Sequence, residues 1–488
     1  EGAFRRSDDY RAPHMPGGHV PATFNDGETG TIGLSWVGDA GYFGAAFTRQ
    51  RSEYGIPGHA HGFEECHPRD GRLHCPAEDD HDHDHDHDHD HDDDHDHDHH
   101  AAGSHLPFVD LRSDRVDIRG EYRAPLAFID RIRLRAGVTD YEHDEIEDGE
   151  ISTTFRNEGL DGRLELEHAP LGPLTGVIGL QGARSEFDAI GDESYLPPST
   201  TTSGAIFVME SWDAGPFRLE AALRQEWQKI SAEGRPRAAK HSPFSVSAAA
   251  VWSVDGDWSV GLSLARSERA PTPQELFADG VHLATNSYEI GNPGLGKEAT
   301  KSVELNLRKT EGATRISLGL FHYRVDDHIY AATLDKVDDM RLVRYAAADA
   351  RFTGIDGSIS HSLTSSLDVT LFSDYVRGKF AEGGNLPRIP GGRLGGRVEW
   401  GTGGFDATVE YFHLFRQNRI AEFETATPGH DMLNLTLSYA LDLGGASGQI
   451  YLSADNLLDV TARNHSSFIK DTVPLPGRNI VLGLRASF

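Results

Sequence analysis

Apolar and polar residues alternate with a period of two along many segments of this chain. Residues 303–308 read Val-Glu-Leu-Asn-Leu-Arg, residues 449–454 read Gln-Ile-Tyr-Leu-Ser-Ala, and every second residue of 480–488 is apolar. Successive side chains of a strand point to opposite faces of a sheet, so each such segment has one apolar and one polar face. About nineteen segments follow this pattern. The chain is therefore predicted to be all-β.

The length of these segments favours strands that cross a membrane. Many run for about ten to eighteen residues, whereas strands of soluble proteins average about five or six and a tilted membrane-spanning strand needs about nine to eleven. A soluble sandwich or propeller is the alternative, but no repeat of propeller length is visible. No apolar run is long enough for a transmembrane helix. We expect a transmembrane antiparallel β-barrel.

The connections between the segments alternate in length. Short connections such as Gly38–Gly41, Asp255–Trp258 and Leu443–Gly448 alternate with long ones. Bacterial outer-membrane barrels have short periplasmic turns and long extracellular loops. The pattern therefore places the long connections outside the cell, including residues 55–107. The long connections are expected at 55–107, 191–201, 233–242, 271–300, 331–341, 380–388, 424–430 and 465–478.

The formal net charge of −31 indicates which partners the chain can have. Residues 78–100 alone hold thirteen acidic side chains and no lysine or arginine. Nucleic acid is an unsuitable partner, because phosphate binding needs a basic patch. Cations are the natural partners of such a chain. No nucleophile elbow, HExxH motif or phosphate loop is present, so the chain is not predicted to be an enzyme.

Three groups of motifs resemble those of TonB-dependent outer-membrane receptors. The first is ARSERAPTPQELF at 265–277, which is followed by GNPGL at 291–295. The second is LPRIP at 386–390. The third is YLSADNLLD at 451–459 with PLPGR at 474–478 and a last strand that ends in phenylalanine. Because they occur in this order and end at the chain terminus, the resemblance covers nearly the whole chain.

This resemblance implies a 22-stranded barrel in the bacterial outer membrane, with a lumen filled by a plug domain. It also implies active uptake, in which TonB pulls on the plug. No plug, TonB box or signal peptide is visible, and only about nineteen strands can be counted. We therefore expect residues 1–488 to be an N-terminally truncated barrel whose plug is not in this chain. Outer-membrane lipid and, through the plug, TonB are the expected partners.

Residues 55–107 carry the metal chemistry and are expected to form a distinct extracellular loop. Fifteen of the 27 histidines lie between His59 and His105. Neutral imidazole binds zinc, copper and nickel, and carboxylates add further ligands. The His-Asp tract is too polar and acidic to fold, so it should offer many weak, exchangeable sites. The candidate ligands here are His59, His61, His67, His74, His81, His83, His85, His87, His89, His91, His95, His97 and His99.

The two cysteines of the chain, Cys66 and Cys75, bracket His67 and His74. A disulfide is the expected state outside the cell, where thiols oxidise. It would stabilise the loop by roughly 2–3 kcal/mol and hold His67 and His74 close to each other. The alternative is a zinc site made by both cysteines and both histidines.

The segment YGIPGHAH at 54–61, the cysteine-histidine bracket and the His-Asp tract together resemble the zinc-uptake (ZnuD-type) branch of these receptors. The resemblance implies that zinc is the transported ligand. Copper and nickel stay possible, because copper binds such ligands more tightly in the usual divalent order.

A transporter also needs ligands inside the mouth of the barrel. Within 271–300 we expect His282 to be a metal ligand and Glu275 to assist it. A second acidic cluster with a histidine lies at Tyr141–Glu145. The sequence thus predicts a TonB-dependent zinc receptor. A haem or metal-chelate receptor of the same fold, or a surface protein that sequesters metal without transport, are the alternatives.

Overall fold

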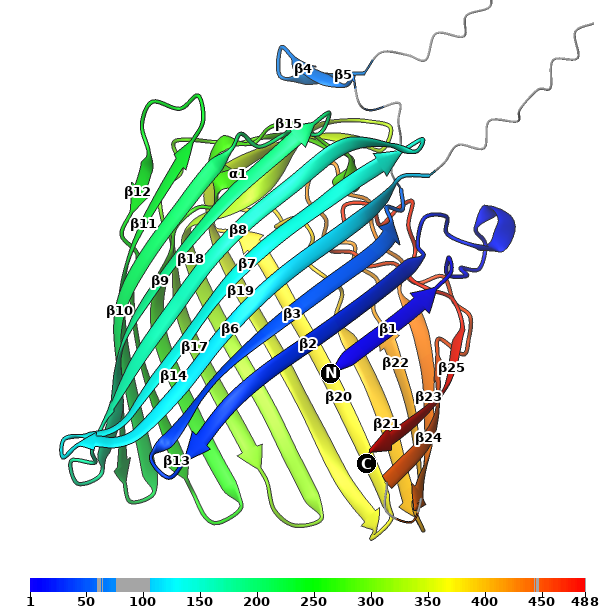
Figure 1. Cartoon of the computed structure of the whole chain (residues 1–488). Helices are drawn as coiled ribbons and strands as arrows, with labels where there is room; N and C mark the ends of the chain where they lie inside the picture. Colours follow the sequence, from blue (N-terminus) through cyan, green and yellow to red (C-terminus); the bar gives the residue numbers. More distant parts are fainter. Residues whose placement is uncertain (59–62, 64, 76–105, 443, 445–446, 488) are drawn as a thin grey trace, which may run out of the picture.

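The computed structural model describes the chain except for residues 59–62, 64, 76–105, 443, 445–446 and 488 (Figure 1). In the described part, 23 strands form one sheet that curls into a barrel wall, and nineteen of these strands have at least nine residues. The predicted all-β antiparallel fold is confirmed. The wall consists of β1 (Gly2–Ser7), β2 (Asn25–Gly38), β3 (Gly41–Gly55), β6 (Phe108–Leu126), β7 (Ile129–Glu147), β8 (Glu150–His168), β9 (Leu174–Gly191), β10 (Ser199–Ala214), β11 (Phe217–Ala232), β13 (Phe244–Ser253), β14 (Trp258–Arg269), β17 (Glu298–Lys309), β18 (Thr314–Val337), β19 (Met340–Thr364), β20 (Leu367–Phe380), β21 (Arg393–Thr402), β22 (Phe405–Leu414), β23 (His430–Asp442), β24 (Ser447–Asp455) and β25 (Asn479–Ser487).

Each long strand pairs with the next one in sequence, in antiparallel register. The ladder between β3 and β6 runs to the pair Gly55–Phe108, so the connection that carries the histidine tract begins only after the ladder is complete. Within the described residues, β1 pairs with β2, β25 pairs with β24, and no ladder joins β1 to β25.

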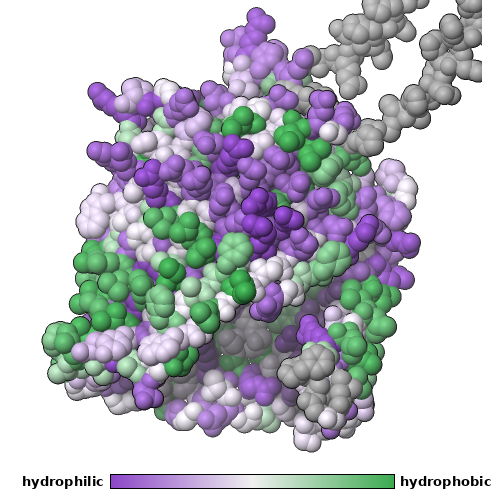
Figure 2. Space-filling model, in the orientation of Figure 1, coloured by the Kyte–Doolittle hydropathy of each residue, from purple (hydrophilic) through white to green (hydrophobic). Residues whose placement is uncertain are grey.

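The apolar face of the wall points outward. Ile32, Leu34 and Trp36 of β2 are 74%, 84% and 68% exposed, and Leu482 of β25 is 73% exposed. Figure 2 shows hydrophobic residues over the lower half of the wall and hydrophilic residues over the upper half, toward the long loops. A soluble protein would bury such side chains, whereas a lipid bilayer solvates them.

Short turns lie at one end of the barrel and the long connections at the other (Figure 1). One expected loop is wrong. Residues 331–341 belong to a hairpin in which β18 reaches Val337 and β19 starts at Met340. Cross-strand pairing continues past the neighbouring strands there, with register shifts near Val325 and Thr333.

The long connections contain short elements of their own, above the barrel wall in Figure 1. Buried apolar residues gather beneath them, including Tyr195, Ile230, Leu276 and Phe277. None of the described helices is both long enough and apolar enough to span a membrane. The short elements are η1 (Pro16–Gly18), β4 (His67–Arg69), β5 (Arg72–His74), β12 (Ala239–His241), α1 (Pro273–Phe277), β15 (Asp279–His282), η3 (Leu283–Thr285) and β16 (Ser287–Ile290).

Candidate metal-binding region

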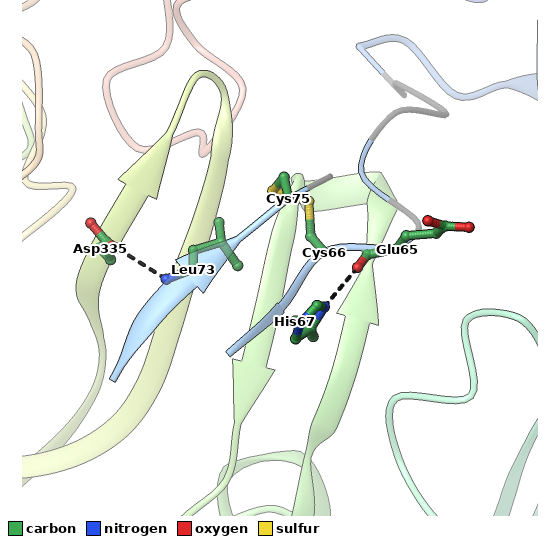
Figure 3. Close-up of a disulfide and its surroundings, with 6 residues drawn as sticks. All are labelled: Glu65, Cys66, His67, Leu73, Cys75 and Asp335. Atoms are coloured by element: carbon green, nitrogen blue, oxygen red, sulfur yellow. Dashed lines mark hydrogen bonds between the residues drawn. A yellow bond between two sulfur atoms is a disulfide. The ribbon is translucent and has the colours of Figure 1, made fainter. Parts of the chain in front are cut away.

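Strands β4 and β5 form a small hairpin above the mouth of the barrel. Asp70 and Gly71 connect the two strands, and both have positive φ (52° and 76°). An Asp-Gly pair with two positive φ values is the preferred chemistry of a tight hairpin turn. A disulfide between Cys66 and Cys75 joins the open ends of the strands (Figure 3).

The hairpin places His67 directly opposite His74. The two are partners in the β-ladder, their ring centroids lie 6.3 Å apart, and both residues are exposed. His67 Nδ1 lies 3.0 Å from the carbonyl oxygen of Glu65, so Nδ1 carries the proton and donates it there. The lone pair of Nε2 then stays available, which is the form of imidazole that binds a metal ion.

The hairpin is packed against the projecting β18–β19 hairpin. Leu73, which is 5% exposed, belongs to a buried cluster with Val281, Met340 and Leu342. The backbone N–H of Leu73 donates to Asp335 Oδ2 at 3.0 Å (Figure 3). Two buried side chains, those of Leu73 and Cys66, and one hydrogen bond therefore fix the position of the two histidines relative to the barrel.

His282 lies at the end of β15, which pairs with β16 in the connection between β14 and β17. Its Nδ1 is 3.0 Å from Glu289 Oε1, and its ring stacks on Tyr195 with centroids 4.5 Å apart. Glu289 also accepts hydrogen bonds from Gln274 and Tyr345, at 2.7 and 2.9 Å. Burial acts to raise the pKa of Glu289, but the hydrogen bond and charge of His282, together with the hydrogen bonds from Gln274 and Tyr345, outweigh burial and hold the pKa below its ordinary value.

Two buried carboxyl groups, Glu193 and Glu145, lie next to each other, and Glu193 also lies close to His282. Glu193 Oε2 accepts a hydrogen bond from the backbone N–H of Leu283 at 2.6 Å. Burial, with the charge of Glu145 second, raises the pKa of Glu193 to about 8. Glu193 Oε1 and Glu145 Oε2 are buried, and the two carboxyl groups share a hydrogen bond for which Glu193 supplies the proton. Such a pair is costly to bury unless a proton or a cation neutralises it.

Glu275 has a structural role in this arrangement. It occupies the third position of α1, where it forms a capping box with Thr272. Its two carboxylate oxygens also accept hydrogen bonds from Arg269 at 2.9 and 3.0 Å. Because both oxygens are already used by donors, Glu275 is poorly suited to bind a metal ion.

The predicted ligands are only partly brought together. His67 and His74 form a pair, and His282 stands beside Glu289 and Glu193. Across the described ranges, no group of three or more His, Cys, Asp or Glu side chains is arranged to hold a metal ion. His59, His61 and the tract from His81 to His99 lie outside the described residues.

The sequence marked Glu289 within the 271–300 loop beside His282, but not Glu193, Tyr195 or Tyr345 as part of this region. These three residues and Glu289 come from the β9–β10 connection, β16 and β19, and meet only when the wall curls and the loops fold over it. Glu145 was visible, as the end of an acidic segment. Nothing local in the sequence marks its contact with Glu193.

The fold and the outward apolar belt define a barrel of the outer-membrane class. The family model described as "TonB dependent receptor-like, beta-barrel" matches residues 16–457. This chain belongs to the TonB-dependent receptor family, whose barrels lie in the outer membrane of Gram-negative bacteria and whose members are receptors and transporters that work with TonB.

Solved structures with the same fold include several metal transporters. The copper transporter OprC matches with a TM-score of 0.80 and 15% identity over 100% of this chain and 75% of that one. The FrpB iron transporter from Neisseria meningitidis (F3-3 variant) matches with a TM-score of 0.73 and 14% identity, over 100% of this chain and 76% of that one. BauA, the ferric preacinetobactin receptor from Acinetobacter baumannii, matches with a TM-score of 0.70 and 13% identity, over 100% of this chain and 74% of that one. At these identities the likeness shows the fold.

Proposed function

We propose that this protein is the barrel of an outer-membrane receptor for zinc uptake. The connection between β3 and β6 faces the outside of the cell and collects the ion on its histidines and aspartates. The ion then passes to ligands at the mouth of the barrel and crosses when TonB acts through a plug domain.

The observation that carries this proposal is the pairing of His67 and His74. They belong to the same connection as the His-Asp tract, and a disulfide and a buried leucine fix their position. Two imidazoles on directly opposite positions of a ladder can bind one ion, because side chains at such positions are about 5 Å apart at Cβ. The hairpin therefore presents its two imidazoles at a fixed separation, which favours tight binding of one ion.

A second station with two ligands is proposed at His282 and Glu193, whose charges interact. A divalent cation bound there would displace the proton that Glu193 shares with Glu145. Imidazole with carboxylate is a ligand set that zinc accepts. A cation bound there would also remove the cost of burying two carboxyl groups side by side.

The experiment is a competitive metal titration of the purified chain in detergent. Zinc, copper, nickel, iron and haem are compared on the wild type, on a version without residues 78–100, and on a His67→Gln/His74→Gln variant. His14→Gln/His19→Gln is the matched control, because it removes two histidines outside this connection.

We expect the version without the tract to retain tight zinc binding at low stoichiometry. The His67→Gln/His74→Gln variant should bind zinc at least about tenfold more weakly, since two ligands are lost. Loss of all affinity with the tract would contradict the proposal, and tight binding of haem alone would favour the haem receptor. Copper or nickel binding in preference to zinc would change the assigned metal but leave the site.

A further inference from the structure

A row of basic residues crosses four neighbouring strands of the wall, in a chain whose net charge is −31. The strands are β17, β18, β19 and β20, and each pairs with the next one. The row consists of Lys301, Arg324, Arg351 and Lys379, and each member is directly opposite its neighbour in the ladder. Side chains at such positions are about 5 Å apart at Cβ, so the like charges of this basic row repel one another.

The basic row lies on the outward face, on the loop side of the apolar belt. Each member is an even number of residues from an exposed apolar side chain of its own strand, so both are on the same face. Arg324, for example, lies four residues beyond Leu320, which is 40% exposed. Four residues of a tilted strand rise roughly 10 Å, which is the level of the lipid headgroups. The corresponding apolar residues of the other three strands are Leu305, Ile355 and Leu371.

Most of these cations have no carboxylate partner. Lys301 pairs with Asp326 at 2.6 Å. Within the described residues, the other three members of the basic row, and Arg377 on the same face of β20, have no ion pair and no side-chain hydrogen bond. The nearest carboxylates along these strands, Asp326, Asp327 and Asp349, lie on the loop side of the row, where Asp349 accepts the backbone N–H of Asp327 at 3.0 Å. An anion would therefore meet the free positive charge from the side of the apolar belt.

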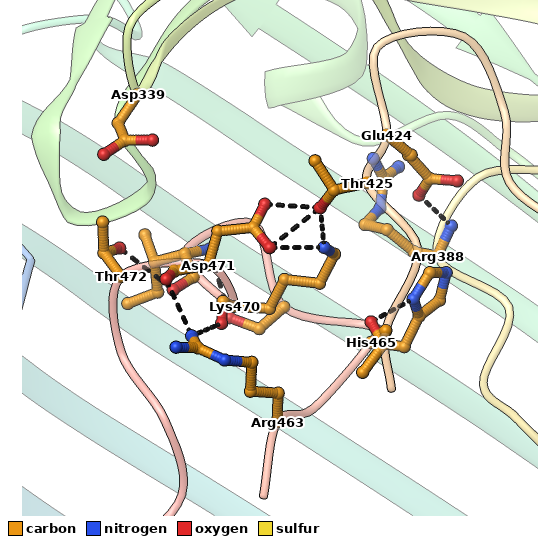
Figure 4. A network of polar contacts seen from close by, with 12 residues as sticks. Asp339, Arg388, Glu424, Thr425, Arg463, His465, Lys470, Asp471 and Thr472 are labelled. Atoms are coloured by element: carbon orange, nitrogen blue, oxygen red, sulfur yellow. Dashed lines mark hydrogen bonds and ion pairs between the residues drawn. The ribbon is translucent and has the colours of Figure 1, made fainter. Parts of the chain in front are cut away.

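Several other basic residues at this end of the barrel have partners within the chain. Arg51 and Arg112 are also directly opposite each other, on β3 and β6, but each pairs with a carboxylate, at 3.6 and 2.8 Å. Among the loops, Lys470 donates to Asp471 at 2.8 Å, and Arg388 donates to a backbone carbonyl group at 3.4 Å (Figure 4). The free charges of the basic row thus distinguish this sector of the wall from the sector of β3 and β6.

We propose that the basic row binds the phosphate groups of a phosphorylated lipid in the outer leaflet of the membrane. A phosphate between Arg324 and Arg351 accepts charge-assisted hydrogen bonds from both guanidinium groups and removes their mutual repulsion. The acyl chains of the same lipid lie along the exposed apolar side chains below the row, and free phosphate has no such contact. That the loop side faces the outer leaflet rests on the orientation used in the proposed function. The binding itself does not, because it is tested in detergent micelles.

The test is binding of radiolabelled diphosphoryl lipid A, a glycolipid with two phosphate groups, to the full chain in non-ionic detergent at constant ionic strength. We expect saturable binding, weakened at least about tenfold in Arg324→Gln/Arg351→Gln, because two charge-assisted hydrogen-bond donors are lost. Arg51→Gln/Arg112→Gln is the matched control and should bind like the wild type. It also removes two directly opposite arginines on the outward face, but these arginines already have carboxylate partners.

Thermal unfolding in the same detergent separates a lipid site from a structural role. Without lipid, Arg324→Gln/Arg351→Gln should melt at a temperature no lower than the wild type, because repulsion across the ladder is relieved. Diphosphoryl lipid A should raise the melting temperature of the wild type more than that of the variant, since a ligand stabilises the state that binds it. A variant that melts lower without lipid would contradict the proposal, because the two arginines would then support the fold.

Equal weakening in the two double variants would overturn the proposal. So would displacement of the lipid by inorganic phosphate at the same concentration, since the site would then be one for free phosphate. Should the test variant fail to fold, the wild type alone decides. It should bind the dephosphorylated glycolipid at least about tenfold more weakly than diphosphoryl lipid A, and equal binding of the two would contradict the site. Failure here with intact zinc binding would leave the proposed function standing.

Discussion

Side chains at the mouth of the barrel differ in how much hydrogen-bonding capacity they have left. Both oxygens of Glu275 are used by donors from its own segment. In the described structure Nε2 of His67 has no hydrogen-bond partner, and Glu193 and Glu145 share one proton that a cation can displace. His67, Glu193 and Glu145 can therefore bind a ligand, whereas Glu275 holds its loop in shape.

Asp471 gives a prediction with a defined pH window. Partial burial acts to raise its pKa, but hydrogen bonds from Lys470 and Thr425 and the charges of Lys470 and Lys336 outweigh burial and lower the pKa below its ordinary 3.8. A carboxylate with a lowered folded-state pKa stabilises the fold above its unfolded-state value, and this contribution disappears as the pH falls through the folded-state pKa.

Asp471→Asn should therefore reduce the free energy of unfolding by about 1 kcal/mol at pH 7. The difference from the wild type should shrink below about pH 3.8. Urea unfolding in detergent at pH 7 and pH 3 measures both values. Asp39→Asn, in the exposed turn between β2 and β3, is the control and should change neither. An equal loss for Asp471→Asn at both pH values would show that the charge of Asp471 is not responsible.

At this scale the sequence predicted residue types better than contacts. The Cys66–Cys75 bracket and its two histidines could be named because the chain brings them together locally. Glu193 and Arg388 could not, because their partners lie far away in the sequence. A polar residue in a loop has no periodicity, and periodicity is the signal on which sequence reasoning depends.

Among the elements, the β18–β19 hairpin contacts several of the long connections at their end of the barrel. It continues past the neighbouring strands, pairs in parallel with β16, and receives Leu73 of the β4–β5 hairpin. The sequence predicted the long strands and the alternation of connections, because lipid on one side enforces a period of two. The sequence wrongly predicted a loop at 331–341. A hairpin that lies outside the bilayer needs no apolar outer face, so its strands do not show the period of two.

Replacement of Leu73 tests the attachment of the β4–β5 hairpin. Leu73→Ala removes most of a buried side chain, which costs about 2–5 kcal/mol at well-packed sites. We expect the hairpin to detach while the disulfide keeps its shape, so that amide hydrogen exchange of residues 66–75 accelerates and the melting of the barrel does not change. Leu171→Ala, which alters an exposed leucine on the side of the short turns, is the control. Unchanged exchange in Leu73→Ala would contradict the attachment.

The whole molecule has its polarity reversed relative to a soluble protein. Large apolar side chains face outward along the wall, and buried apolar clusters lie chiefly under the loops. Within each strand of the wall, neighbouring residues therefore meet lipid and lumen in turn.

This arrangement predicts opposite outcomes for two adjacent residues of β14. Leu264→Arg puts a charge on the lipid face and should destabilise the folded barrel by about 2–4 kcal/mol in lipid bilayers. Ser263→Arg, its neighbour on the lumen face, should have a much smaller effect. Urea titration of folding into phospholipid vesicles, followed by the electrophoretic mobility of the folded barrel, compares the two. A similar loss for both variants would contradict the assignment of faces.

The complete ladder between β3 and β6 has a consequence for how this protein can evolve. The pairs up to Gly55–Phe108 form without any help from the residues that follow Gly55. A repeated His-Asp unit in that connection can therefore be duplicated or deleted two residues at a time while the register of the wall stays the same. The number of histidines and aspartates in this connection can thus change within a lineage in small steps, independently of the inheritance of the barrel.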